Sequence, residues 1–192
     1  MQVEGAWRRG WTLDVHTTSS EFIGYDHNGR AQFDTTRSAL GELVYQLKYR
    51  SQSQAADEIA ATMAAFLSNK PVTMSRIDLV VPVPASTARP VQPVTTIAAT
   101  LAKKLSKPFS KNAIQKTKET PTLKSITDLE ERREALDDAF EADRAQLNGK
   151  GILLVDDLYR SGSTANAVTL ALIAAGASRV YFVAATRTRS NA

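Results

Sequence analysis

Two adjacent carboxylates, Asp156 and Asp157, follow directly after the apolar residues 152–155. A carboxylate that is buried without a partner loses its hydration, so a pair at this place needs partners or a ligand. Paired carboxylates are well suited to accept hydrogen bonds from neighbouring hydroxyls, such as the 2- and 3-hydroxyls of a ribose. The pair therefore indicates a binding site for a diol.

A short polar loop follows the pair, and its last residues, 161–164, read Ser-Gly-Ser-Thr before an alanine-rich stretch typical of a helix. Small residues let the backbone approach a ligand closely. The free N–H groups and the positive dipole at a helix start attract a phosphate. Carboxylates that accept hydrogen bonds from a diol, followed by a helix start that binds a phosphate, indicate a site for ribose 5-phosphate. The alternative is a strand end with two solvated aspartates, followed by an ordinary capped helix.

Apolar runs and helical patterns alternate from residue 77 onward, as expected for an α/β domain. Runs typical of buried strands occupy residues 77–84, 151–155 and 179–185. Residues 91–105 and 165–175 have the character of helices, and Gly176 is a C-terminal stop. Continuous apolar strands between helices predict a parallel sheet covered on both faces. Because ligands bind beyond the carboxyl ends of such strands, the acidic pair lies in the predicted binding crevice.

Three further segments of this part of the chain have weaker patterns. Residues 108–114 are expected to form a strand, and residues 128–140 a helix. Residues 115–127 are rich in lysine and threonine and follow neither period, so a loop is expected there.

The first part of the chain predicts a hairpin and helices. Residues 10–18 and 20–27 resemble strands, and Asn28-Gly29 is a hairpin turn signal before residues 30–36. Leu40, Leu43, Val44 and Leu47 then fall at helical spacing, with Ser38 as the expected N-cap, and a second helix is expected at 55–67. We expect one folded domain with an N-terminal hood at residues 1–50 and an α/β core at residues 51–192.

The composition is that of a globular protein. The length of 192 residues suits one domain with a substantial core. No apolar run approaches the roughly 20 residues that span a bilayer, and no apolar segment follows Arg8 and Arg9 as in a secretory signal. The absence of cysteine excludes disulfides and thiolate zinc sites. We therefore expect a cytoplasmic protein that does not interact with a membrane.

The basic charge balance favours anionic ligands. A net charge of +4 suits nucleic acid or small phosphates without choosing between them. Lysines crowd residues 103–124, where Glu119 is the only acid, and either a solvated surface or a contribution to phosphate binding explains them. Binding of single-stranded DNA would favour aromatic residues between the lysines, but this segment contains only Phe109.

Other conspicuous residues do not form a recognisable site. His16 and His27 have no carboxylate or second histidine at metal-ligand spacing, so a zinc site is not expected. Trp7 and Trp11 are expected to be partly buried under the core, with stacking on a base as the alternative.

Residues 152–164, ILLVDDLYRSGST, resemble the phosphoribosyl-pyrophosphate (PRPP) binding motif of the type I phosphoribosyltransferases. The shared features are an apolar strand, an acidic pair and a small polar loop that ends in Gly-x-Thr. A coarser similarity from about residue 40 to 189 follows the order seen in ComF-like phosphoribosyltransferases. Two features depart from that family. The amino-terminal cysteine zinc segment is absent, and Arg160-Ser161 replaces a pair of threonines found in many relatives.

The resemblance implies a transferase that joins a phosphoribosyl group from PRPP to a base or an amine and releases pyrophosphate. PRPP would bring Mg²⁺ with it, and Asp156 and Asp157 would hold the ribose hydroxyls directly or through metal-bound water. A nitrogen nucleophile would then capture an oxocarbenium-like sugar at C1. The implied PRPP contacts are Asp156, Asp157, Leu158, Tyr159, Arg160, Ser161, Gly162, Ser163 and Thr164.

Two further segments correspond to functional loops of the family. A pyrophosphate loop is expected after the strand at 77–84, although the prolines there are equally well explained as a strand end. The expected loop residues are Pro84, Ala85, Ser86, Thr87, Ala88 and Arg89. Residues 115–127 correspond to a flap that closes over PRPP, in which Lys116 and Lys118 would either meet the pyrophosphate or be ordinary surface lysines.

Three functional classes remain after this comparison of motifs. The first is the PRPP-dependent transferase, whose acceptor would be read by the hood, and the family resemblance also allows a homodimer. The second is a non-catalytic sensor of PRPP or nucleotides on the same fold. The third is a ComF-like accessory protein in DNA uptake, whose basic surface would contact nucleic acid.

Overall fold

The computed structural model describes residues 1–50, 52–85, 92–117 and 139–189. Its centre is a five-stranded sheet in the order β1-β2-β9-β8-β5. Strands β2, β9, β8 and β5 are parallel neighbours, and β1 pairs antiparallel with β2. The strands are β1 (Gln2–Val3), β2 (Arg9–Val15), β5 (Leu79–Pro82), β8 (Gly151–Tyr159) and β9 (Arg179–Arg187). The predicted α/β architecture with a parallel sheet is confirmed.

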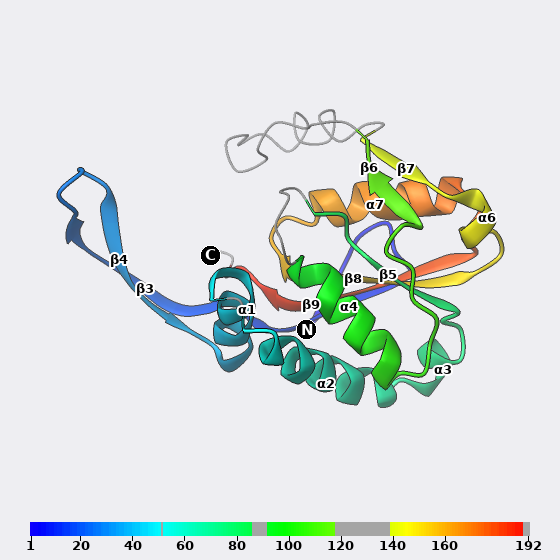
Figure 1. The fold of residues 1–192 in the computed structure, drawn as a ribbon, viewed down its shortest axis with the longest axis horizontal. Helices are drawn as coiled ribbons and strands as arrows, with labels where there is room; N and C mark the ends of the chain where they lie inside the picture. The colour runs from blue at the N-terminus through cyan, green and yellow to red at the C-terminus, as the bar shows by residue number, and fades with distance from the viewer. Residues whose placement is uncertain (51, 86–91, 118–138, 190–192) are drawn as a thin grey trace.

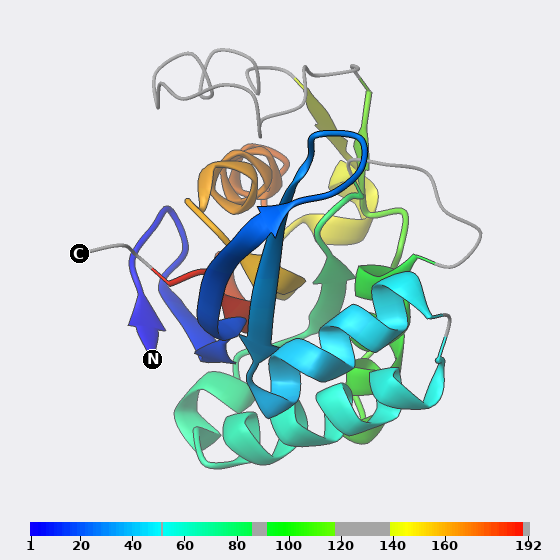
Figure 2. The same ribbon diagram turned by 90° about the vertical axis from the view of Figure 1, so that its left-hand side faces the viewer.

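Helices cover both faces of this sheet (Figures 1 and 2). Alternate residues of β8 divide between the faces, as the pleat of a strand requires. Leu153 and Val155 enter one apolar cluster, and Ile152 and Leu154 enter the other. The first cluster packs on α1 (Ala39–Tyr49), α2 (Gln54–Ser68) and α4 (Pro93–Lys104), and the second packs on α7 (Ser163–Ala174).

Short elements complete the described chain. Helix α3 (Pro71–Met74) follows α2, and α6 (Arg144–Leu147) precedes β8. The predicted helix stop is confirmed, because Gly176 directly after the α7 C-cap has a φ of 98°. Trp7 and Trp11 are buried in different apolar clusters, as expected. Within the described ranges, no helix has the length and apolarity needed to cross a membrane.

The predicted N-terminal hairpin is present and projects from the body of the molecule (Figure 1). Strands β3 (Thr17–Tyr25) and β4 (Ala31–Arg37) pair antiparallel, and Gly29 in the turn has a φ of 72°. The side chain of Asp26 accepts hydrogen bonds from the backbone N–H groups of Asn28 and Arg30. The sequence signal at Asn28-Gly29 therefore marks a real hairpin turn. The first two strands of the chain belong instead to the central sheet.

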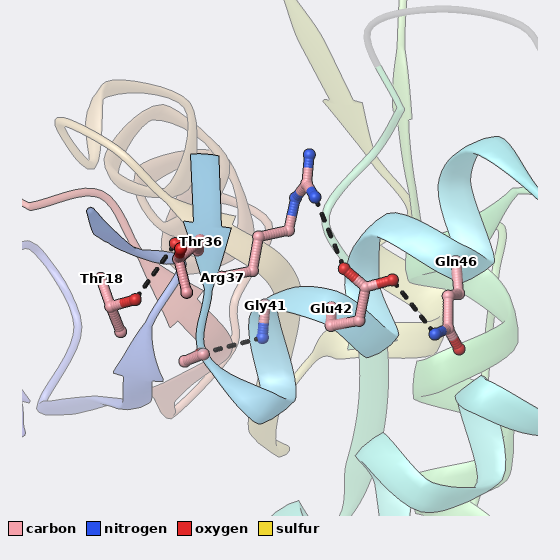
Figure 3. A network of polar contacts seen from close by, with 7 residues as sticks. Thr18, Thr36, Arg37, Gly41, Glu42 and Gln46 are labelled. Atoms are coloured by element: carbon pink, nitrogen blue, oxygen red, sulfur yellow. Dashed lines mark hydrogen bonds and ion pairs between the residues drawn. The ribbon is translucent and has the colours of Figure 1, made fainter. Parts of the chain in front are cut away.

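A polar network fixes α1 to the base of this hairpin (Figure 3). Ser38 is the N-cap, as predicted, and its hydroxyl accepts a hydrogen bond of 3.0 Å from the Gly41 N–H. The same hydroxyl donates to the Val15 carbonyl at the end of β2. Arg37 forms an ion pair of 3.4 Å with Glu42 in the first turn of the helix. These bonds set where α1 begins relative to β2 and β4.

Three expectations about local structure were wrong in part. Strand β8 runs on to Tyr159 rather than ending before the acidic pair, because it continues to pair with β9 as far as Arg187. Residues 108–113 form only a bridge between Phe109 and Val80, because the chain bends at residues 111–113. A loop was expected at residues 115–127 and a helix at 128–140. Instead, strand β6 (Ile114–Lys116) lies at the start of this segment and pairs with strand β7 (Phe140–Ala142) at its end. Residues 118–138 lie outside the described residues.

Gly41 provides a test of how closely α1 packs on the hairpin base. A Cβ atom at this position would lie 2.0 Å from the backbone oxygen of His16. A glycine to alanine change inside a helix is normally stabilising by about 1 kcal/mol. We expect Gly41→Ala to destabilise the protein by about 1–3 kcal/mol instead, because the backbone must shift to relieve the clash. Thermal melts measure this difference, and a higher melting temperature for the variant would contradict the close approach.

Candidate functional site

The acidic pair lies in the second half of β8, where its two side chains belong to opposite faces of the sheet. Successive residues of a strand point to opposite sides, so Asp157 shares a face with Val155 and Asp156 shares a face with Leu154. Asp157 is therefore on the side of α1, and Asp156 is on the side of α7. Asp157 is 6% exposed, and Asp156 is less deeply buried.

Asp157 is held by a lysine from the N-terminal part of the chain. The ammonium of Lys48, in the last turn of α1, donates to Asp157 Oδ1 at 2.7 Å. A charged carboxylate so deeply buried needs such a partner. Sequence reasoning missed Lys48, which lies 109 positions away from Asp157. The available signal was its place four residues after the buried Val44, at the edge of the apolar face of α1.

A second contact with Asp157 runs through its backbone. The buried hydroxyl of Thr186 in β9 donates to the Asp157 carbonyl, and the same oxygen lies 3.1 Å from His16 Nδ1. Because the hydroxyl proton points to the carbonyl, His16 Nδ1 acts as the donor in this arrangement. Burial and the nearby cations Lys48 and Arg37 lower the pKa of His16, which favours the neutral imidazole. His16, which lies between β2 and β3, thus makes a structural contact with β9.

Asp156 has the electrostatics of a group that exchanges a proton near neutral pH. Burial and the neighbouring charge of Asp157 raise its pKa to about 7. Its Oδ1 accepts a hydrogen bond of 2.8 Å from the Asp157 N–H, which opposes the shift, as does the charge of Lys48. Perturbed carboxyl groups at the carboxyl end of a sheet are typical of functional sites. The structure therefore separates the pair into an anchored Asp157 and a titrating Asp156.

The turn after β8 is open at the start of α7. Its N-cap is Gly162, with a φ of 79° and no side-chain cap for the helix. The Ser161 hydroxyl lies 2.9 Å from the Ser163 hydroxyl and makes a long contact of 3.4 Å with the Ser163 N–H. In the described chain, the N–H groups of Thr164 and Ala165 have no acceptor. The helix start therefore presents two free donors next to three hydroxyls, which is the arrangement that suits a phosphate.

Gly162 is needed at this turn for two reasons. Its φ lies in the left-handed region, which disfavours other residues. A Cβ atom would also lie 2.8 Å from the ring of Tyr159. Tyr159 itself packs edge-on against Trp7, with ring centroids 6.3 Å apart, and its burial raises its pKa. The Tyr159 ring thus packs closely against the turn at Gly162, and its implied contact with PRPP stays a prediction.

The remaining predicted residues are only partly placed by the structure. Pro84 and Ala85 leave the sheet beside the acidic pair, because the Val83 N–H still donates to the Val155 carbonyl of β8. Arg160 is exposed in the turn, next to Leu158 and Tyr159 in β8. Lys116 is the last residue of β6. Four residues of the pyrophosphate loop and one of the flap lie outside the described residues: Ser86, Thr87, Ala88, Arg89 and Lys118.

No protein-family model and no curated protein sequence matches the chain. Three solved structures illustrate its similarity to known folds. Adenine phosphoribosyltransferase of Giardia lamblia, complexed with 9-deazaadenine, is 17% identical, with 86% of this chain and 79% of that chain covered and a TM-score of 0.48. Adenine phosphoribosyltransferase of Thermoanaerobacter pseudethanolicus is 16% identical, with 88% and 95% covered and a TM-score of 0.46.

The third similar structure is the phosphoribosylpyrophosphate synthetase of Mycobacterium smegmatis, at 18% identity and a TM-score of 0.45. The match covers 67% of this chain, which spans only 33% of the synthetase. At these identities and TM-scores, the assignment of function depends on the motif and on the geometry of the site.

Lys48 gives the first test of this site. Lys48→Met leaves the charge of Asp157 buried without its partner, and breaking a fully buried pair typically destabilises a protein by about 3–5 kcal/mol. We expect a loss of about 2–3 kcal/mol, because Lys48 keeps 20% of its side-chain exposure. Urea unfolding measures the change in the free energy of unfolding. The double variant Lys48→Met/Asp157→Leu should recover most of the loss.

Lys104 provides the matched control, since it pairs at 2.9 Å with Asp57, whose side chain is 63% exposed. Lys104→Met should lower the free energy of unfolding by less than about 1 kcal/mol. Equal effects of the two lysine variants would contradict the anchoring role of Lys48.

Asp156 gives a pH-dependent test. Its pKa is about 7 in the folded chain against 3.8 as the ordinary value. Its folded pKa is raised, so its contribution to stability is complete below pH 3.8 and is lost as the pH rises to about 7. Asp156→Asn should therefore match the wild type in melting temperature at pH 4 and exceed it at pH 8. The exposed Glu141→Gln serves as control, and a difference that does not change with pH would contradict the raised pKa.

Proposed function

We propose that the chain is a PRPP-dependent phosphoribosyltransferase that transfers a phosphoribosyl group to a base or an amine and releases pyrophosphate. The junction of β8 and α7 carries this proposal. There, the titrating Asp156 precedes a turn whose Thr164 and Ala165 N–H groups are open. A carboxylate acceptor and free N–H donors at this spacing suit the two ends of a ribose 5-phosphate.

The two carboxylates are proposed to have different roles. Asp157 already accepts from Lys48, so it holds the end of β8 against α1 and offers its remaining lone pairs to the ligand. Asp156 is the principal acceptor for the ribose hydroxyls. The 5-phosphate would lie on the open N–H groups at the start of α7, with the hydroxyls of Ser161, Ser163 and Thr164 around it. Arg160 is exposed beside this turn, and a guanidinium fork suits phosphate oxygens.

The residues present fit Mg²⁺ that arrives with its substrate. Among the described residues, no group of three or more His, Asp or Glu side chains is placed to hold a metal ion. Ions of this type commonly bind one or two carboxylates together with substrate phosphates. Asp156 would hold the ion, directly or through water, and Asp157 would assist. When bound, Mg²⁺ supplies positive charge that stabilises the departing pyrophosphate.

In the proposed reaction, the bond between C1 of the ribose and the pyrophosphate oxygen breaks, and its electron pair leaves with the pyrophosphate. The lone pair of an acceptor nitrogen forms the new bond at C1, and the proton that this nitrogen carried is released to solvent. The chain contributes by fixing the ribose and the 5-phosphate, so that C1 faces the acceptor. Cations of the predicted loops, Arg89, Lys116 and Lys118, are proposed to stabilise the pyrophosphate charge.

The finer parts of this proposal rest on the sequence motifs. These are the likeness to ComF-like transferases, the reading of the acceptor by residues 1–50, a homodimer and a cytoplasmic location. The projecting hairpin is compatible with an acceptor-reading role, because it joins α1 at the side of the sheet where Lys48 meets Asp157.

Isothermal titration with PRPP, with and without Mg²⁺, tests the proposed function. We expect PRPP to bind, and Mg²⁺ to strengthen the binding. Thr164→Val keeps the shape of the side chain but removes one hydroxyl. Because a hydrogen bond to a charged group contributes roughly 1.5–3 kcal/mol, the affinity should fall by about one to two factors of ten. The melting temperature should not change, whereas a mere helix cap would lower it and leave the affinity unaltered.

A panel of nucleobases and amines, assayed for pyrophosphate release, then tests catalysis. Release with one acceptor class supports the transferase. Binding of PRPP without release for any acceptor would contradict the transferase and favour a non-catalytic sensor, and absence of binding in both titrations would remove both functions.

A further inference from the structure

A second site of basic character lies at the other end of the central sheet. A cavity of about 220 Å³ is lined by Arg8, Arg9, Val72, Thr73, Arg76 and Tyr181. Arg9 opens β2 and pairs with Tyr181 near the start of β9, and Arg8 directly precedes β2. Val72 and Thr73 come from α3, and Arg76 follows that helix. Tyr181 pairs with Leu153 of β8, three positions before Asp156, so the two sites are separated by about 10 Å along the strands. Figure 1 shows α3 far from the hairpin.

The lining of this cavity carries uncompensated positive charge. Among the described residues, it contains three guanidinium groups and no carboxylate. In the described parts of the chain, none of the three arginines takes part in an ion pair. Asp78, the acid nearest to Arg76 in sequence, accepts a hydrogen bond of 2.7 Å from the Gly151 N–H through Oδ2 and takes part in no ion pair within the described chain. Three guanidiniums around one space favour an oxyanion, which each can bind through paired N–H donors.

Two mostly buried residues of the lining bring further hydrogen-bonding groups to the cavity. Thr73 is 5% exposed and Tyr181 is 3% exposed, and neither hydroxyl makes a hydrogen bond to any part of the chain that is described. Neither hydroxyl oxygen is among the fully buried polar atoms without a partner, so both remain accessible from the surface. Both residues line the cavity, where their hydroxyls are available to the same oxyanion.

From these observations we propose that the cavity binds the phosphate group of a small molecule. The size suits a phosphate or pyrophosphate with a small substituent, whereas nucleic acid needs an extended basic groove with exposed aromatic rings for stacking. Tyr181, the aromatic residue of the lining, is buried in the core and offers no such platform. The site is distinct from the open turn at α7, since it uses side-chain guanidiniums at the amino ends of the strands.

Residue-resolved NMR titrations with inorganic phosphate and with pyrophosphate test this proposal. We expect the backbone signals of Thr73, Arg76 and Tyr181 to shift with a saturable dependence on ligand concentration. Arg76→Gln should weaken this binding about tenfold or more, and Arg8→Gln should act similarly, because each removes charge-assisted hydrogen bonds. Both arginines are exposed, so the variants should keep the melting temperature of the wild type. Thr73→Val should weaken binding less than either arginine variant.

Arg144→Gln is the matched control, because this exposed arginine of α6 does not line the cavity. It should leave the titration unchanged. Equal weakening by Arg144→Gln, absence of shifts at Thr73, Arg76 and Tyr181, or binding of a single-stranded oligonucleotide in place of both phosphates would overturn the proposal. The signals of Gly162, Ser163 and Thr164 monitor the α7 turn separately. Binding at the cavity can therefore be measured even if no ligand binds at the proposed transferase site.

Discussion

The ion pair between Lys48 and Asp157 is the contact on which the arrangement of the site depends. It joins the last turn of α1 to the end of β8 at 2.7 Å, across 109 positions of sequence. The carboxylate is almost fully buried and needs this partner. Because Ser38 and Gly41 fix the start of α1 to β2 and to His16, the position of Lys48 follows from the hairpin base. The N-terminal elements thus reach the acidic pair directly.

The two aspartates of the pair differ in their electrostatics. Two adjacent carboxylates repel each other, and burial adds to the cost of charging them both. Burial and the charge of Asp157 raise the pKa of Asp156, and the charge of Lys48 opposes this rise. The alternation of β8 places the anchored group towards α1 and the titrating group towards α7. A pair that looks symmetrical in sequence therefore has one member anchored by Lys48 and one member with a raised pKa.

Short sequence motifs correctly predicted the features of the fold that depend on neighbouring residues alone. Asn28-Gly29 marked the hairpin turn, Ser38 marked the cap of α1, and Gly176 marked the end of α7. The extension of β8 through Asp156 and Asp157 was missed, because acidic residues are poor strand formers and only pairing with β9 keeps them extended. β7 was missed for a similar reason, since Phe140 pairs with Lys116 from a distant segment. Lys48 and the arginine cavity depend on residues that only the tertiary structure brings together.

A crystal structure of the chain with PRPP and Mg²⁺ tests the central claim most directly. The account predicts the 5-phosphate on the N–H groups of Thr164 and Ala165, with a ribose hydroxyl within hydrogen-bond distance of Asp156 and the Lys48–Asp157 pair intact. A 5-phosphate bound away from the start of α7, or a ribose that does not contact Asp156, would contradict it.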